Sequence, residues 1–370
     1  MATTVEAVLS VLGKVIDPDL HKDIVTLGFV GKDDVVIDGT TVKATVYLTT
    51  PACPVKDQLQ AECVGLIEGL DGVEKADVTM NARTAGGRSG DDARSERLTG
   101  VKNIIAVGSG KGGVGKSTVA ANLAYALRQT GATVGILDAD IYGPSMPILL
   151  GIRGKAPSMT ADQKIEPIEK YGLKVISMGL LLKETDAVVW RGPMLGKALQ
   201  QFVDDVAWGE LDYLVIDLPP GTGDVQLSLA QLVPVDGTVV VTTPQDVAFA
   251  DVRRAIRMFQ MTRVPILGLV ENMSYFRCPD NGKDYEIFGK GRTEAHAEEL
   301  ETLFLGRLPI DMKVGPAADK GELIAIADPN GDQAKRYAEL AGRVASELSK
   351  RAMAKQQKAS LKGFFSVKQS

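Results

Sequence analysis

A glycine-rich loop whose residue types suit phosphate binding lies in the first half of the chain. The run Gly110-Lys111-Gly112-Gly113-Val114-Gly115-Lys116-Ser117 matches the P-loop pattern, and Thr118 continues it. Glycines allow backbone N–H groups to turn toward phosphate oxygens, and the positive end of a following helix adds to the attraction. We expect Lys116 to reach the β- and γ-phosphates and the Ser117 hydroxyl to ligate Mg²⁺. The loop therefore predicts a site for ATP with Mg²⁺.

Three aspartates add acidic chemistry at the ends of two apolar runs. Asp217 closes the run in "LVIDLPPGTGD", where a carboxylate can hold Mg²⁺ through water. Asp138 and Asp140 follow the run in "GILDADIYGPS", and a carboxylate there, Asp140 in our prediction, orients or activates an attacking water. The alternative for each aspartate is a helix cap or a turn residue.

The helices and strands that must position these residues are predicted to form a doubly wound α/β domain over residues 100–349. Short apolar segments rich in β-branched residues are typical of strands buried on both faces of a parallel sheet. Helical stretches separate several of them, which predicts a mostly parallel sheet with ligands at the carboxyl ends of its strands. The expected strands are "NIIAVGS", "TVGILDAD", "LKVISMG", "DYLVIDLPP", "GTVVVTTP" and "PILGLVENM", and the clearest helices are "KSTVAANLAYALRQT" and "DVAFADVRRAIRMFQM".

Three further segments flank or precede this domain. Residues 1–82 combine two helical patterns with strands and predict a small α+β domain, with Cys63 in its core. Residues 83–99 are small, glycine-rich and charged, as in a flexible linker. Residues 350–370 carry six Lys or Arg and no acid. This basic tail is either a solvated, partly disordered end or a weak helix for a membrane surface or a partner.

Bulk composition excludes several classes of protein. A net charge of −5 and a pI near 5.4 disfavour nucleic-acid binding through bulk electrostatics. The N-terminal segment lacks the basic start of a signal peptide, and no uncharged apolar run approaches the length of a membrane span. The chain has three cysteines, whereas a disulfide framework normally has a larger, even number. We expect a cytoplasmic protein.

The early lysine of the loop gives a more specific resemblance. "KGGVGKST" resembles the deviant Walker A loop of MinD/ParA/ArsA-type ATPases, in which this lysine contacts the nucleotide of the other subunit. The resemblance implies a homodimer in which Lys111 supplies positive charge across the interface during ATP hydrolysis, as an arginine finger does.

Almost the whole chain resembles the Mrp/ApbC family of iron–sulfur cluster carriers. The first module resembles the SufT-like (MIP-type) domain through "DPDLHKDIVTLGFV" and "TTPACP". The resemblance implies transfer of clusters to apoproteins, contacts with iron–sulfur assembly proteins, and adenine binding near Asn272, Pro309 and Asp311. The stretches that carry it are "KGGVGKST", "ILDADIYGPSMP", "VVWRGPML", "DYLVIDLPPGTGDVQLSL", "VVVTTPQDVAFADVRRAI", "GLVENMSYFRCP" and "EIFGKG".

The cysteine motif departs from the family pattern. Carriers of this family use a Cys-x-x-Cys pair from each subunit, whereas here Cys278 is followed by Asn281 in the second position. Asparagine is a poor iron ligand, and two Cys278 thiolates fall short of the four that usually hold a [4Fe–4S] cluster. Either two Cys278 residues and other ligands, such as a small thiol, hold a [4Fe–4S] or [2Fe–2S] cluster, or Cys53 contributes. In the third alternative the chain keeps only an ATPase switch that docks on a membrane surface or a partner.

Overall fold

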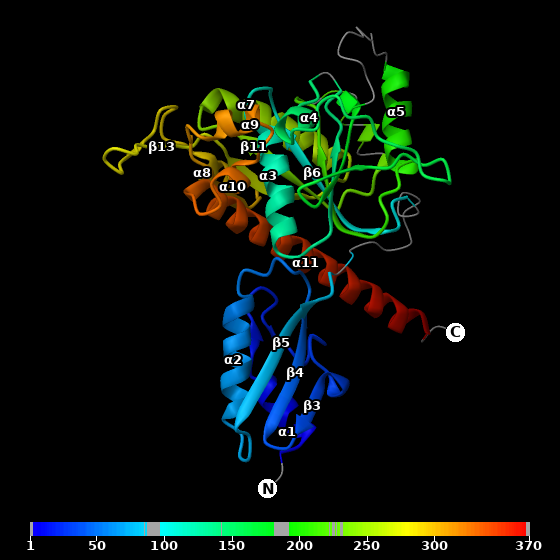
Figure 1. The fold of residues 1–370 in the computed structure, drawn as a ribbon, viewed down its shortest axis with the longest axis vertical. Helices are drawn as coiled ribbons and strands as arrows, with labels where there is room; N and C mark the ends of the chain where they lie inside the picture. Colours follow the sequence, from blue (N-terminus) through cyan, green and yellow to red (C-terminus); the bar gives the residue numbers. More distant parts are fainter. Residues whose placement is uncertain are drawn as a thin grey trace. The chain divides into compact units, whose positions relative to one another are not determined.

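The computed structural model divides the chain into two compact units, Met1–Gly86 with Ala345–Ser370, and Gly87–Val344 (Figure 1). Side chains are described for all the residues that the structure describes except 192–195 and 358–367. The predicted linker, 83–99, lies largely outside the described part, which comprises residues 3–84, 86, 97–141, 143–180, 192–221, 223, 226, 228–229 and 232–367.

The first unit holds a small three-stranded sheet with two helices. β3 and β4 pair antiparallel across a two-residue turn, and β5 pairs parallel with β4. Alternate residues of β4 are buried, as expected for a strand with one face on a core, and Cys63 lies fully buried in that core. Its elements are α1 (Val5–Leu12), β1 (Ile16–Asp17), β2 (Lys22–Asp23), β3 (Val35–Asp38), β4 (Thr41–Leu48), α2 (Lys56–Glu68) and β5 (Lys75–Ala82).

The second unit contains one eight-stranded sheet in the order β15-β12-β11-β6-β10-β7-β9-β8. Every neighbouring pair is parallel except β8 and β9, which are antiparallel at one edge. Its strands are β6 (Val101–Ser109), β7 (Val134–Asp138), β8 (Ile168–Lys170), β9 (Leu173–Ser177), β10 (Leu211–Asp217), β11 (Gly237–Thr242), β12 (Ile266–Glu271) and β15 (Phe304–Arg307).

Several helices pack on this sheet. α3 contacts β6, β7 and β10, while α7 contacts β6 and β11. All residues of β7 and β11 are buried, because β-branched and aliphatic side chains face packed layers on both sides. The helices of this unit are α3 (Lys116–Gln129), α4 (Met146–Leu149), α5 (Gly192–Asp204), α7 (Asp246–Met261), α8 (Thr293–Glu299), α9 (Val314–Asp319), α10 (Ile324–Ala327) and the first part of α11 (Asp332–Val367), whose residues from Ala345 on are grouped with the first unit.

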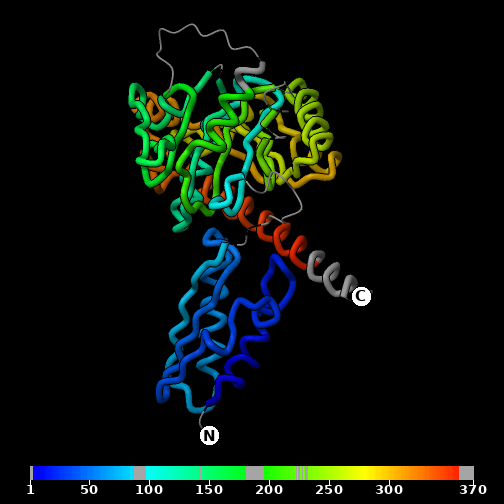
Figure 2. The backbone as a smooth tube through the Cα atoms, turned by 90° about the vertical axis from the view of Figure 1, so that its right-hand side faces the viewer, coloured from blue at the N-terminus to red at the C-terminus, as the bar shows by residue number. Residues whose placement is uncertain are grey.

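The predicted fold class is confirmed, and the structure adds short strands that the sequence did not indicate. β8, β15 and the hairpin of β13 (Phe276–Arg277) with β14 (Asp284–Tyr285) are two to four residues long, too short to show a clear period. α11 continues past residue 349, so the first part of the basic tail is helical, in line with the second of the two alternatives for it (Figure 2). Ala, Lys, Gln and Leu predominate there, and these residues favour a helix. Within the described residues, no helix combines the length and the apolar character required to cross a membrane.

Candidate functional site

The P-loop runs from the end of β6 to the start of α3. Gly113 and Gly115 have φ of 78° and 79°, in the left-handed region that glycine adopts at low cost. A Cβ added to Gly115 would also overlap the Asn272 amide, so a larger residue does not fit there. The loop borders a cavity of about 230 Å³ lined by Ser109, Lys111, Gly112, Gly113, Gly115, Lys116, Ser117, Thr118, Asp140, Ser145, Leu149 and Pro220.

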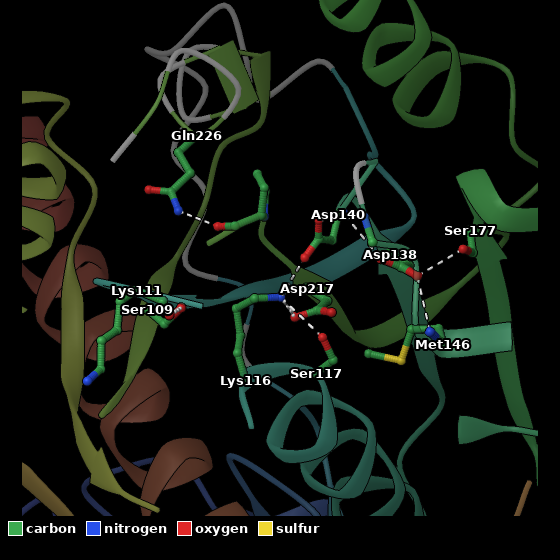
Figure 3. Close-up of polar contacts among 12 residues, drawn as sticks. Ser109, Lys111, Lys116, Ser117, Asp138, Asp140, Met146, Ser177, Asp217 and Gln226 are labelled. Atoms are coloured by element: carbon green, nitrogen blue, oxygen red, sulfur yellow. Dashed lines mark hydrogen bonds and ion pairs between the residues drawn. The ribbon is translucent and has the colours of Figure 1, made fainter. Parts of the chain in front are cut away.

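Lys116 occupies the centre of a buried polar cluster beneath this loop (Figure 3). Its Nζ lies 2.5 Å from Asp217 Oδ1, 3.6 Å from Asp140 Oδ2 and 3.2 Å from Ser117 Oγ. Only 6% of Lys116 is exposed, and Asp217 is fully buried. Asp217 ends β10 and is in register with Asp138 of β7, so neighbouring parallel strands bring the acidic residues together. The ammonium group of Lys116 is thus neutralised by the protein itself.

Asp217 has the properties of a cation ligand. Burial raises its pKa and the Asp140 charge adds to the increase, while the ion pair and hydrogen bond with Lys116 oppose it. Among the described residues, its buried Oδ2 has no hydrogen-bond partner. An unsatisfied carboxylate oxygen in a buried site is costly unless a proton or a cation joins it. Asp217 and the neighbouring Ser117 hydroxyl therefore suit a hard cation such as Mg²⁺.

Asp138 and Asp140 have different environments although they are two residues apart. Asp138 Oδ2 accepts hydrogen bonds from Ser177 Oγ and Met146 N, and its Oδ1 accepts one from Asp140 N. Burial and the nearby Asp217 charge raise the pKa of Asp138 to about 7. Its carboxylate therefore joins β7, β9 and α4, whereas Asp140 faces Lys116 and the cavity.

Lys111 points away from this cluster (Figure 3). It is half-buried, and within the described part of the chain it forms no ion pair, while its backbone carbonyl accepts a hydrogen bond from Ser109 Oγ. The preceding Gly110 lies against α7 so closely that an added Cβ would overlap the Asp251 backbone. The charge of Lys111 is therefore not matched by an ion pair within the described residues.

The three residues expected near adenine do not line the cavity at the P-loop. Asn272 is buried at the end of β12, and its Nδ2 donates a 2.9 Å hydrogen bond to the Val114 carbonyl of the P-loop. The Pro309 carbonyl accepts a hydrogen bond from Gln333, and Asp311 Oδ1 accepts one from Lys313 N. None of the three lines the cavity at the loop. Asn272 is thus held against the loop, while Pro309 and Asp311 are hydrogen-bonded to other parts of the chain.

Cys278 lies in the turn between β13 and β14. Its backbone N donates to Lys283 O and its carbonyl accepts from Gly282 N, both at 2.9 Å. Asn281 is exposed; its Nδ2 donates to Tyr285 OH and its Oδ1 accepts from Lys283 N. The half-exposed thiol of Cys278 is free, whereas the Asn281 side chain forms hydrogen bonds that stabilise the turn.

Cys53 occupies a different setting in the first unit. Its half-buried thiol packs against that unit's hydrophobic core. Burial raises its pKa, and the charges of Asp17 and Asp19 raise it further. Metals bind the thiolate, so this environment disfavours ligation. No cluster of three or more His, Cys, Asp or Glu side chains able to hold a metal occurs in the described residues.

Two buried side chains, Gln226 and Glu271, lie in stretches that resemble the carrier family, but the sequence analysis gave neither of them a role. Gln226 Nε2 donates to the Pro219 carbonyl and so fixes the turn after Asp217. Glu271, at the end of β12, accepts hydrogen bonds from Ser274 and Thr293. For Glu271, a charged residue within an apolar predicted strand is the sequence feature that indicates a special role.

Comparison with known proteins decides the family. The model of the NUBPL iron-transfer P-loop NTPase matches residues 100–345, which is more than half of the chain, and the model of an iron-sulfur cluster assembly protein matches residues 5–79. The chain belongs to the NUBPL iron-transfer P-loop NTPase family. The predicted resemblance to iron–sulfur carrier ATPases, with a separate N-terminal module, is therefore confirmed.

Relatives of this NTPase extend over nearly its whole length. A protein of Synechocystis sp. named iron-sulfur cluster carrier protein is 46% identical over 95% of this chain and 99% of its own. A Deinococcus radiodurans protein of the same name is 46% identical over 94% and 97%. A solved nucleotide-binding protein from Archaeoglobus fulgidus in complex with ADP is 39% identical, with a TM-score of 0.58 over 67% of this chain and 97% of that one.

Proposed function

We propose that this NTPase is an ATP-dependent carrier that binds an iron–sulfur cluster as a homodimer and delivers it to apoproteins. The observation that carries the proposal is the presence, in one compact unit, of the P-loop with its buried Lys116–Asp217 pair and of the Cys278 hairpin with its free thiol. Relatives named iron-sulfur cluster carrier protein support the assignment of the cargo.

In this proposal, nucleotide binding replaces the ion pair between Lys116 and Asp217 by an ion pair between Lys116 and the phosphates. The P-loop N–H groups and Lys116 receive the phosphates, so the Lys116 ammonium turns from Asp217 and Asp140 toward phosphate oxygens. Asp217 and the Ser117 hydroxyl would hold Mg²⁺, directly or through water, and the ion would supply positive charge to the phosphates. The partnerless Asp217 Oδ2 supports this role.

Hydrolysis requires a positioned water and additional positive charge. Asp140 is freed when Lys116 moves to the phosphates, and its carboxylate then accepts a hydrogen bond from the attacking water. Lys111 of a second copy supplies charge to the γ-phosphate in the transition state. Its orientation away from its own cluster agrees with a role across a dimer interface.

The cluster in this proposal lies between two copies of the Cys278 hairpin. Each copy contributes one thiolate, and we favour a [4Fe–4S] cluster whose remaining iron ligands come from a small thiol or from the client apoprotein. The Asn281 side chain is engaged within the turn and offers only weak donors to iron. The raised pKa of Cys53 makes it the weaker candidate.

Anaerobic reconstitution with ferrous iron and sulfide tests the carrier function. We expect the wild-type dimer to retain about four iron and four sulfide ions, if a [4Fe–4S] cluster is held. Cys53→Ser is the matched control, because it removes a free thiol in the other unit and leaves the hairpin intact.

Two outcomes decide the result. Cys278→Ser should lose the iron and sulfide, whereas Cys53→Ser should keep both. A wild-type protein that retains no cluster with or without ATP removes the carrier function and leaves only the nucleotide switch.

A further inference from the structure

Glu271 forms a buried polar cluster that the nucleotide site does not use. Only 1% of this side chain is exposed. Its Oε1 accepts a hydrogen bond from Ser274 Oγ and its Oε2 accepts one from Thr293 Oγ1, while Arg307 Nε lies 3.6 Å from Oε1. A buried carboxylate with both oxygens engaged is held firmly, because losing either donor leaves it undersatisfied.

These hydrogen bonds connect the two ends of the segment that carries Cys278. Ser274 lies two residues before the hairpin strand β13, and Thr293 begins α8, so Glu271 joins the two ends of the intervening segment, 275–292. Gly291 lies so close that an added Cβ would overlap the Glu271 carboxylate. The hairpin carrying Cys278 therefore leaves the sheet at a point fixed by Glu271.

The next two residues connect the same point to the P-loop. Asn272 donates to the Val114 carbonyl. Met273 has φ of 54°, a left-handed conformation that residues other than glycine rarely adopt. A Cβ on Gly115 would lie 3.7 Å from Met273 Cε, so this side chain also borders the loop. Such strained residues persist where the surrounding structure demands them, often at sites with a function.

We propose that Glu271 is a positioning residue that couples nucleotide binding at the P-loop to the position of the Cys278 hairpin. The coupling rests on the proposed function, since it gives the nucleotide a means to act on the cargo site. Backbone hydrogen bonds from Asn272 N to Thr242 O and from Ser274 N to Leu308 O hold the connecting turn on the sheet. Because this turn is held by hydrogen bonds, a displacement of the P-loop also displaces the Cys278 hairpin.

The rate of Cys278 alkylation by iodoacetamide, followed by peptide mass mapping, tests the coupling without any iron. We expect Mg·ADP or Mg·AMP-PNP to change the wild-type rate by about fivefold, the lower end of common coupling strengths. Alkylation of Cys53, in the other unit, serves as an internal reference within each sample.

Thr293→Val removes one donor to Glu271 while nearly keeping the shape of the side chain. Thr302→Val is its matched control, because the buried Thr302 hydroxyl has no hydrogen-bond partner within the described residues. We expect Thr293→Val to bind nucleotide as the wild type does but to lose most of the alkylation response, and Thr302→Val to keep the response.

Glu271→Gln provides a second variant if Thr293→Val does not fold, since glutamine keeps the size and removes the charge opposite Arg307. It should also lose the response. A wild-type rate unaffected by nucleotide, or equal responses in Thr293→Val and Thr302→Val, would overturn the coupling. Either result leaves the carrier proposal to be decided by the iron and sulfide content.

Discussion

Lys116 and Asp217 form a 2.5 Å ion pair in the protein interior, and the same lysine lies 3.6 Å from Asp140. A phosphate that enters the loop must compete with these carboxylates for the ammonium group. In the proposed mechanism, binding at the P-loop is therefore an exchange of partners for Lys116 that frees the carboxylates of Asp217 and Asp140.

Lys116→Ala should remove nucleotide binding. The variant loses the charge that meets the phosphates and leaves Asp217 buried without its partner. We expect affinity to fall by at least about 30-fold, the effect of roughly 2 kcal/mol for truncating one member of a buried charge pair. Titration with a fluorescent ADP analogue measures the change. Lys102→Ala, which removes a lysine from the exposed ion pair with Asp212, is the control and should bind normally.

Lys111→Ala should retain nucleotide binding and lose hydrolysis. The side chain points away from its own site, so its loss removes charge only from the partner's transition state. We expect a decrease of about 10³-fold in the ATPase rate, as for loss of an arginine finger.

Mixing variants distinguishes action across the interface from action within one subunit. A mixed dimer of Lys111→Ala and Asp140→Asn contains one complete site only if Lys111 acts on the other copy's nucleotide. An equal mixture should then recover about a quarter of the wild-type ATPase rate. No recovery, or a wild-type rate for Lys111→Ala alone, contradicts the trans role.

Gly115→Ala should destabilise the protein more than Gly113→Ala. Both glycines have left-handed φ, so each alanine introduces backbone strain of about 1–2 kcal/mol. Only at Gly115 does the new Cβ also overlap Asn272, whereas at Gly113 it meets open space. Urea unfolding of both variants measures the difference. Adding Asn272→Ala to Gly115→Ala should recover part of the loss; strictly additive effects would show that the overlap is unimportant.

Acid should weaken the packing between α7 and α8. His296 stacks on Phe249 with ring centroids 3.4 Å apart. Desolvation lowers its pKa, and the Arg292 charge lowers it further. The folded state therefore favours neutral histidine, so its contribution to stability is present above pH 6.5 and is lost as the pH falls through the lowered pKa.

His296→Phe keeps an aromatic ring against Phe249 and removes the titration. Between pH 7.5 and pH 5.5 the free energy of unfolding should fall more in the wild type than in this variant. Urea denaturation at the two pH values measures the effect, and equal decreases would exclude His296 as the cause.

Local sequence patterns were sufficient for much of the fold and the phosphate site. The P-loop follows β6 and opens α3 as the motif requires, and Asp217 ends a buried strand as predicted. These features depend on residues that are neighbours in sequence. Strand β12 was also expected from its apolar run, because burial on both faces leaves a nearly continuous pattern.

The remaining features depend on contacts between distant segments. The hydrogen bond between Asn272 and Val114 joins residues 158 positions apart, and nothing in either local stretch indicates it. The roles of Asp138 and Asp140 depend on Ser177 and Lys116, which reach them only in the folded sheet. The Glu271 cluster likewise forms when α8 returns to the end of β12.

The backbone of the Cys278 turn is already hydrogen-bonded to itself, and the Asn281 amide adds to this network. The conformational entropy of the turn is therefore lost during folding and not when cargo arrives. Under the proposed function, an incoming cluster would meet a turn that is already folded, and its departure would leave that turn intact. A turn that is ordered in advance lowers the entropic cost of holding the cluster.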